Sequence, residues 1–352
     1  MPALMIPLLQ PVSATMRYAD YPRAAVEDIA RLRRRLDGAE IPPRRTDHNL
    51  LIGTWNLRNF GRVHPSWSEN SGSPKRNWRA LACIAEIVRR FDVVAIQEVK
   101  RDTSGIRMLV DEFLGPNWGV LLSDVSGGDK GNEERLAYVY DRRRVTPSGL
   151  AGEIVLPPAT TGNPAEQFDR TPYIVGFRAA DEHFALLTVH IRYGDRAADR
   201  LGELKELAVY TAAQLRDRAK TRGSEEANLI VLGDFNIDRR GSDPLFDAFV
   251  STGLTVPEKL LNVKTTYGAE AKHYDQIAWF MGSMDLLTEK RAGVVDFMGT
   301  VLKELTPRQV SDRISDHFPL WVEFIIDRST EAMARTLGLD PATPNPLSTV
   351  PD

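Results

Sequence analysis

Short runs of apolar and β-branched residues recur through most of this chain, separated by polar loops or by stretches with helical periodicity. Such runs are typical of β-strands, and an unbroken apolar run indicates a strand buried on both faces. The predicted strands are Leu50–Asn56, Val93–Glu98, Leu136–Tyr140, Tyr173–Phe177, Ala185–His190, Leu229–Asp234, Gln276–Phe280 and Leu320–Ile326.

Apolar residues at helical spacing predict helices beside these strands. In the most N-terminal one, Val26, Ile29, Leu32 and Leu36 would share one face. The predicted helices are Ala24–Leu36, Lys75–Arg90, Gly105–Phe113, Arg196–Lys220 and Thr330–Leu337. The pattern divides the chain into three parts: an N-terminal extension (1–47), one α/β domain (48–326), and a short helix with a flexible, Pro-rich tail (327–352).

Polar side chains that can do chemistry stand where the apolar runs begin or end. In α/β folds, functional sites collect where strand ends meet loops, so we expect these side chains to lie together. They are Asn56, Glu98, His190, Asp234, Asn236, Asp275, Asp316 and His317.

This set of side chains suits hydrolysis assisted by a divalent cation. Carboxylate and amide oxygens are the ligands that Mg²⁺, Mn²⁺ or Ca²⁺ prefer, and two histidines offer an acid and a base near neutral pH. Each residue alone has an ordinary structural alternative, because Asn forms turns and a carboxylate at a strand end often caps a helix. The absence of an HExxH motif argues against a zinc hydrolase, and the absence of a GxxxxGK[ST] loop argues against an NTPase.

Charge and cysteine content add little about the reaction but bear on the compartment. The 45 basic and 48 acidic residues give a net charge of −3, and a metal-dependent nuclease need not be basic, since its ligands count as negative until metal binds. Cys83 is the single cysteine, so we expect a reducing, cytoplasmic setting. The apolar segment before Val12-Ser13-Ala14 leaves a secretory signal as the alternative. No apolar run is long enough to span a membrane, and a monomer is the default.

Seven motifs between residues 50 and 326 resemble, in order, those of the endonuclease/exonuclease/phosphatase superfamily, and in particular its deoxyribonuclease I-like branch. They are Asn56-Leu57-Arg58-Asn59-Phe60-Gly61, Ile96-Gln97-Glu98-Val99, Glu134-Arg135, Phe168-Asp169-Arg170-Thr171-Pro172, Gly233-Asp234-Phe235-Asn236, Tyr274-Asp275-Gln276-Ile277 and Ser315-Asp316-His317-Phe318-Pro319.

The resemblance implies a four-layered αββα sandwich of two mixed sheets flanked by helices, and a role for each motif residue. Glu98, Asn56 and Asp316 would hold the principal metal, while Asp234 and Asn236 would orient the phosphate, the attacking water or a second metal. The acid–base pair would be His190, oriented by Glu134, and His317, oriented by Asp275, and Glu133 is the alternative to Glu134. The phosphate-contacting positions would be Arg58, Arg170 and Lys100.

The function that the resemblance implies is endonucleolytic hydrolysis of DNA, duplex or single-stranded, with 5′-phosphate and 3′-hydroxyl products. Asn132 stands where the branch carries an aromatic residue that packs into the minor groove, so strand preference can differ, and RNA is a further alternative. Rival interpretations are a lipid phosphodiesterase of the sphingomyelinase type, an abasic-site endonuclease and a catalytically inactive nucleic-acid-binding protein on the same fold. Trp67 and Trp78 flank a polar loop, Ser66–Asn77, and they either stack on bases or anchor that loop.

Overall fold

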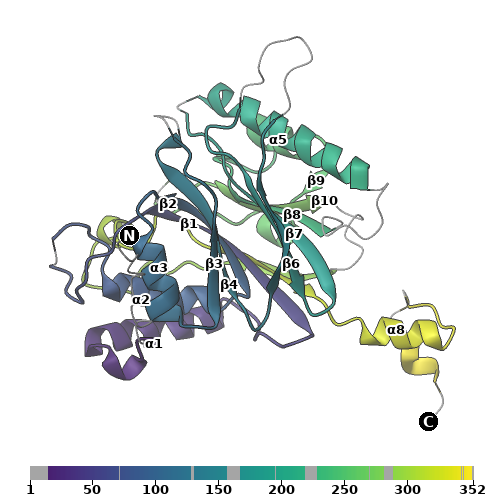
Figure 1. The fold of residues 1–352 in the computed structure, drawn as a ribbon, viewed down its shortest axis with the longest axis horizontal. Coiled ribbons are helices and arrows are strands. Elements are labelled where there is room, and N and C mark those ends of the chain that lie inside the picture. Colours follow the sequence, from purple (N-terminus) through teal and green to yellow (C-terminus); the bar gives the residue numbers. More distant parts are fainter. Residues whose placement is uncertain are drawn as a thin grey trace, which may run out of the picture.

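Two mixed six-stranded sheets pack face to face, with helices on the outer sides (Figure 1). This arrangement, in a computed structural model, confirms the predicted four-layered αββα sandwich. The structure describes residues 15–70, 72–127, 131–156, 167–194, 196–218, 228–268, 270–280, 288–341, 343 and 345–350.

Each sheet has a parallel strand pair near its middle and antiparallel neighbours around it. The first sheet has the strand order β11 (Thr288–Val294), β12 (Leu320–Ile325), β1 (Asn49–Phe60), β2 (Val93–Lys100), β4 (Glu134–Asp141), β3 (Trp118–Leu122). The second has the order β5 (Thr146–Glu153), β6 (Tyr173–Ala179), β7 (Glu182–His190), β8 (Leu229–Asp234), β10 (Asp275–Phe280), β9 (Leu254–Thr255). The parallel pairs are β1–β2 and β7–β8.

Helices from the N-terminal third and from the middle of the chain cover the two outer faces (Figure 1). Over the first sheet lie α1 (Arg23–Gly38), α2 (Trp78–Val88), α3 (Ser104–Met108) and its continuation η2 (Leu109–Leu114). Over the second sheet lie α5 (Ala197–Arg218) and α6 (Pro244–Val250). The remaining short elements are η1 (Tyr18–Asp20), η4 (Glu258–Leu260), α7 (Pro307–Ser311), α8 (Ser329–Thr336) and η5 (Pro346–Thr349).

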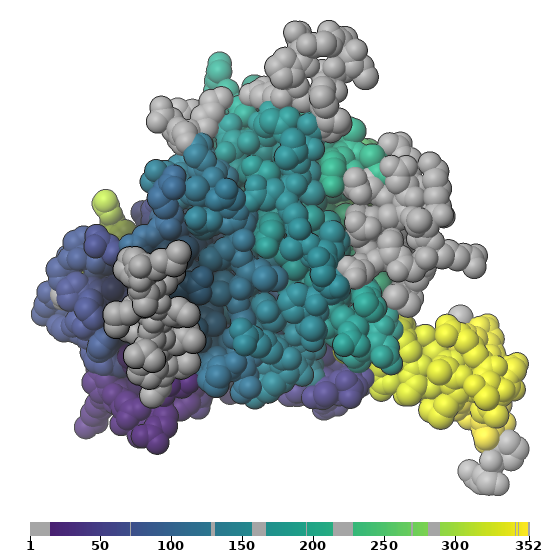
Figure 2. All heavy atoms as spheres, in the orientation of Figure 1, coloured from purple at the N-terminus to yellow at the C-terminus, as the bar shows by residue number. Residues whose placement is uncertain are grey.

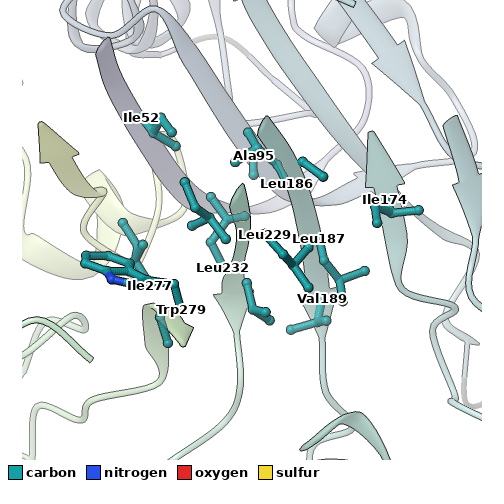
Figure 3. Packing of buried hydrophobic residues seen from close by; sticks show 14 of the residues in the cluster. Ile52, Ala95, Ile174, Leu186, Leu187, Val189, Leu229, Leu232, Ile277 and Trp279 are labelled. Atoms are coloured by element: carbon teal, nitrogen blue, oxygen red, sulfur yellow. The ribbon is translucent and has the colours of Figure 1, made fainter. Parts of the chain in front are cut away.

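Strand β1 shows why the apolar runs belong to central strands. Its side chains alternate between the two cores: Leu50 and Ile52 enter the layer between the sheets, whereas Leu51 and Trp55 pack under the helices. All four are buried because each face of the strand is covered. Figure 3 shows the inter-sheet layer, where Ile52 and Ala95 of the first sheet belong to one cluster with Leu186 and Ile277 of the second.

The structure contains all eight predicted strands and corrects the prediction elsewhere. Strands β3, β5, β9 and β11 and the short helices α6 and α7 were not predicted. Most of these elements are short or mix polar and apolar residues, so they carry no clear apolar period. Residues 219–220 of the predicted helix Arg196–Lys220 lie outside the described residues.

The N-terminal extension packs against the domain rather than standing apart from it. In α1, Ile29, Leu32 and Leu36 lie in one cluster with α2, but Val26 is 40% exposed, so its predicted place on the buried face is wrong. At the other end of the chain, α8 and η5 project from the body of the molecule (Figures 1 and 2). The predicted flexibility of that tail stays a prediction.

Trp67 and Trp78 anchor the polar loop between them. The Trp67 ring lies 4.9 Å from the Tyr21 ring, 5.8 Å from the Trp78 ring and 6.2 Å from the Phe113 ring, measured between centroids. This packing favours the anchoring interpretation over base stacking. Within the described part of the chain, no helix combines the length and apolar character needed to cross a membrane.

The packing of α1 predicts that the extension is needed for stability. Leu32 is fully buried, so Leu32→Ala should lower the free energy of unfolding by about 2–5 kcal/mol, the usual range for a buried leucine. Val26→Ala, at an exposed position of the same helix, is the control. It should change the free energy of unfolding by less than about 0.5 kcal/mol. Equal, small effects of both substitutions in denaturant titrations would show that α1 does not contribute to the core.

Candidate active site

The two parallel strand pairs bring the predicted site residues to one edge of the sandwich. Parallel neighbours end at the same edge of a sheet, so β1 and β2 present Asn56 and Glu98 together, and β7 and β8 present His190 opposite Asp234 in register. The antiparallel neighbours β4 and β10 begin at this edge, and they contribute Glu134 and Asp275.

Asn56 connects the two sheets at the centre of this edge. Its side-chain nitrogen donates to Glu98 Oε1 and to Asp234 Oδ2, both at 2.9 Å, and its side-chain oxygen accepts from the Arg58 N–H at 2.8 Å. Asn56 is fully buried and Asp234 is 2% exposed. A buried carboxylate needs such donors, and Asp234 also accepts from the Asn236 N–H at 2.9 Å. One amide therefore holds a carboxylate from each sheet.

His317 lies between two buried carboxylates. Its Nδ1 is hydrogen-bonded to Asp275 Oδ2 at 2.8 Å, and its Nε2 lies 3.9 Å from Asp234 Oδ2. Burial acts to lower the pKa of His317, but the charges of Asp275 and Asp234 outweigh it and raise the pKa to about 10. Burial raises the pKa of Asp275, whereas for Asp234 the nearby histidines overcome burial and hold the pKa below its ordinary value.

His190 is paired in the same way from the other side. Its Nδ1 lies 2.9 Å from Glu134 Oε2, although the ring N–H does not point straight at that oxygen, and its Nε2 lies 3.6 Å from Asp234 Oδ2. The two imidazoles thus turn their Nε2 atoms toward one carboxylate, Asp234. Glu133 is exposed and pairs with Arg101 at 3.4 Å, so the structure selects Glu134 rather than Glu133 as the partner of His190.

The three predicted phosphate-contacting residues lie beside this site and have partners within the protein. Lys100 Nζ donates to Glu134 Oε1 at 3.0 Å, and Arg170 Nε donates to Glu134 Oε2 at 2.6 Å. Arg58 Nη1 lies 3.5 Å from Asp316 Oδ2, and its side chain is 34% exposed. These contacts place positive charge around the carboxylates, and binding of DNA phosphate by these residues stays a prediction.

The predicted metal ligands fit a hard cation in their chemistry. Glu98 accepts one hydrogen bond on each oxygen, which leaves lone pairs free, and the Asp316 side chain is 36% exposed. Asn56, by contrast, turns its amide nitrogen toward the carboxylates, so serving as a ligand would require that amide to rotate. Asp234, Asp275 and His317 form a second group whose ligand atoms all lie within 4.8 Å of one another. The edge therefore has oxygen donors for a divalent cation at two neighbouring places.

Supporting residues that the sequence analysis did not assign complete the site. Ser315 Oγ donates to the Asn56 carbonyl at 2.6 Å and accepts from the His317 N–H at 3.0 Å. Gln97 donates to Thr188 Oγ1 at 2.9 Å, which joins β2 to β7 beneath the site. Arg200 of α5 donates to the Asn236 carbonyl. Gln97 and Ser315 stand inside recognised motifs, which was the available signal, whereas Arg200 gave none.

Residues 53–251 match the model of the "Endonuclease/Exonuclease/phosphatase family". The chain belongs to this family. It is 30% identical over 289 residues to a "Deoxyribonuclease" of Thioalkalivibrio sp. (strain K90mix), which covers 78% of this chain and 71% of that protein. It is 26% identical to "Deoxyribonuclease gamma" of Rattus norvegicus, covering 80% of this chain and 86% of that protein. These relatives place the chain in the deoxyribonuclease I-like branch, as predicted, and make it a hydrolase of phosphodiester bonds.

Solved structures share the fold of this family member. An endonuclease/exonuclease/phosphatase family protein of Bacteroides thetaiotaomicron aligns with a TM-score of 0.54 and 21% identity, covering 79% of this chain and 95% of that protein. A mannosyl-6-phosphatase of Bacteroides thetaiotaomicron aligns with a TM-score of 0.53 and 22% identity. The alignment covers 78% of this chain and 99% of that protein. At this identity the likeness concerns the fold alone.

The surroundings of Glu134 predict a pH-dependent stability. Burial acts to raise its pKa, but His190, Arg170 and Lys100 outweigh burial and lower the pKa from 4.5 to about 2. Because the folded-state pKa is depressed, the ionised group stabilises the fold above pH 4.5, and this contribution is lost as the pH falls toward 2. The difference of about 2.5 between these two pKa values corresponds to roughly 3 kcal/mol of folding free energy.

Glu134→Gln should therefore be less stable than the wild type at pH 6, and the difference should shrink as the pH falls to about 3.5. Urea unfolding across this range measures it. Glu133→Gln, at the exposed neighbouring position, is the matched control and should follow the wild-type curve. Parallel curves for Glu134→Gln and the wild type would contradict the assigned role of Glu134.

Proposed function

We propose that this protein is a divalent-metal-dependent endonuclease that hydrolyses DNA phosphodiester bonds and leaves 5′-phosphate and 3′-hydroxyl ends. The observation that carries the proposal is the convergence of two carboxylate-paired imidazoles, His190 and His317, on Asp234. Beside them, Glu98 and Asp316 offer oxygen donors for a cation. Hydrolysis of a phosphodiester needs an activated water, a protonated leaving oxygen and stabilised negative charge, and this set supplies a group for each need.

The position of each residue indicates its role in the hydrolysis. The two Nε2 atoms lie 3.6 Å and 3.9 Å from the same oxygen, Asp234 Oδ2, so a phosphoryl group bound next to that oxygen would be within reach of both rings. One imidazole in its neutral form accepts a proton from water, and the other in its protonated form donates one to the leaving oxygen. Glu134 and Asp275 hold the opposite ring nitrogens, which fixes the orientation of each ring. Asn236 is buried beside Asp234, and its side-chain nitrogen donates one hydrogen bond to the Ile191 carbonyl at 2.7 Å, so the second hydrogen of that amide can donate to a phosphate oxygen.

With Asn56 keeping its hydrogen bond to Glu98 Oε1, Glu98 and Asp316 would hold Mg²⁺ or Mn²⁺. Their oxygen atoms are the hard donors that these ions prefer, and Ca²⁺ accepts the same atoms. When bound, the ion would polarise a phosphate oxygen and neutralise charge in the transition state. A bound cation would also offset the negative charge of these carboxylates, so a net charge of −3 for the metal-free chain is compatible with a nuclease.

DNA is favoured over a lipid by two observations. Two relatives are named as deoxyribonucleases and align with most of this chain. In addition, Arg58, Lys100 and Arg170 lie at the rim of the site, where they can exchange a carboxylate partner for a phosphate group of the backbone. The fold itself does not choose the substrate, because a mannosyl-6-phosphatase shares it.

The proposal predicts that the wild-type protein nicks supercoiled plasmid in Mg²⁺ or Mn²⁺, that EDTA abolishes the activity and that added metal restores it. His190→Ala and His317→Ala should each lower the nicking rate by roughly 10²–10⁴-fold, the usual contribution of a general acid or base. The same preparations should release no phosphocholine from sphingomyelin. Initial rates on gels, with melting curves to verify folding, provide the measurement.

Val26→Ala serves as the control for preparation effects, because Val26 is exposed on α1, outside the group of site residues. Plasmid left intact in every metal, together with clear hydrolysis of sphingomyelin, would assign the protein to a lipid substrate. Nicking that persists in EDTA, or near-normal rates from either folded histidine variant, would contradict the proposed chemistry.

A further inference from the structure

Arg76 is a buried cation that donates five hydrogen bonds to backbone carbonyls. The residue is 4% exposed, and its guanidinium lies 5.0 Å from the centre of the Phe60 ring. Burial without a hydrogen-bonded carboxylate lowers its pKa to about 10, although the charges of Glu98 and Asp316 favour the charged form. The acceptors are the carbonyls of Leu57 (2.6 Å), Arg58 (2.9 Å), Asn59 (3.3 Å), Arg313 (2.8 Å) and Ile314 (2.8 Å).

Three of these carbonyls belong to a turn that holds two candidate metal ligands. Arg58 and Asn59 adopt left-handed backbone angles, with φ of 35° and 51°, which non-glycine residues rarely do without compensation. In this conformation the Arg58 N–H donates to Asn56 Oδ1 and the Asn59 N–H donates to Glu98 Oε2, both at 2.8 Å. The carbonyls of the same turn accept from Arg76, so Arg76 stabilises the conformation that fixes Asn56 and Glu98.

The other two carbonyls stand immediately before the segment that carries Asp316. Arg313 and Ile314 lead into Ser315, whose hydroxyl donates to the Asn56 carbonyl, and then into Asp316 and His317. The two segments are distant in sequence, and Arg76 binds both through one rigid, planar group. The spacing between Glu98 and Asp316 therefore depends on where Arg76 lies.

The loop that carries Arg76 is itself firmly held. The Arg76 carbonyl accepts from the His64 N–H at 2.8 Å. The next residue, Asn77, caps α2 by accepting from the Ala80 N–H at 3.0 Å. Glu69 of the same loop forms a 2.7 Å ion pair with Arg313, which ties the loop a second time to the segment before Asp316. The anchored loop thus presents Arg76 from a fixed position.

We propose that Arg76 is a positioning residue for the divalent-cation site: it sets the separation of the Glu98 and Asp316 carboxylates and so determines the affinity of the site for metal. The proposal rests on the proposed function only in requiring that a cation bind at Glu98 and Asp316. Arg76 contacts neither substrate nor cation in this account. Residues that support metal ligands in this way typically contribute 10–100-fold to metal affinity.

The test compares Arg76→Met, Arg76→Lys and the wild type in two assays. Titration calorimetry with Mn²⁺ alone measures the dissociation constant, which should rise about 10–100-fold in Arg76→Met and by a smaller factor in Arg76→Lys. Lysine keeps the charge but has three donors on one atom, so it cannot span both segments. Plasmid nicking at increasing Mg²⁺ should shift to higher concentration by a similar factor, and the rate at saturating Mg²⁺ should return to within a few-fold of the wild type.

Arg144→Lys is the matched control. Arg144 is also a largely buried arginine bound to a backbone carbonyl, that of Asn49 at 2.6 Å, and it pairs with Asp92 at 2.9 Å, at the opposite end of β1 from the site. Its substitution should lower the melting temperature and leave the Mn²⁺ dissociation constant unchanged.

Unchanged Mn²⁺ affinity in folded Arg76→Lys and Arg76→Met would overturn the proposal, as would a nicking rate reduced equally at every Mg²⁺ concentration. If Arg76→Met does not fold, Arg76→Lys decides the question by the same criteria. A wild-type protein that binds Mn²⁺ without cutting DNA would refute the proposed function, while the calorimetry would still test Arg76. A wild-type protein that binds no Mn²⁺ would overturn both.

Discussion

The hydrogen bonds of the Asn56 amide join the two halves of the candidate active site. One amide nitrogen binds Glu98 from the first sheet and Asp234 from the second. This bridge is available because each sheet contains a parallel strand pair ending at the same edge, β1 beside β2 and β7 beside β8. The predicted ligands of the principal cation, Glu98 and Asp316, lie on the Glu98 side of that contact, and the two imidazoles and the second group of donors lie on the Asp234 side.

The same hydrogen bonds help to stabilise the buried charge of Asp234. Burying an ionised carboxylate without partners costs several kcal/mol of folding free energy, so Asp234 requires hydrogen-bond donors from the protein itself. Asn56 and the Asn236 N–H supply them, and the two histidines add positive charge when protonated. Groups held in this way need no rearrangement when charge develops on a substrate, which is the basis of electrostatic preorganisation. The costs of burial are thus offset by interactions that also serve the chemistry.

The sequence predicted the strands that build this edge, because central strands buried on both faces are apolar along most of their length. It also predicted that polar residues at the strand ends, such as His190 and Asp234, would lie together, because parallel neighbours end at the same edge of a sheet. The choice between Glu133 and Glu134 needed the register of β4, which places Glu134 opposite Lys100. Edge strands such as β5, with its Thr146-Pro147-Ser148-Gly149 start, lack an apolar period and were missed. Arg76 left no signal, because it acts through backbone carbonyls of segments far apart in the sequence.

The nicking rate of Asn56→Leu at saturating Mg²⁺ tests the central claim most directly. Leucine is close to asparagine in size but cannot donate to Glu98 and Asp234, so both halves of the site would lose their shared partner. We predict a rate lower than the wild-type rate by roughly 10–100-fold or more, from a protein that still folds. A folded Asn56→Leu protein that nicks plasmid within about threefold of the wild-type rate, a change of less than about 0.7 kcal/mol in the activation barrier, would contradict this account of how the two sheets form one active site.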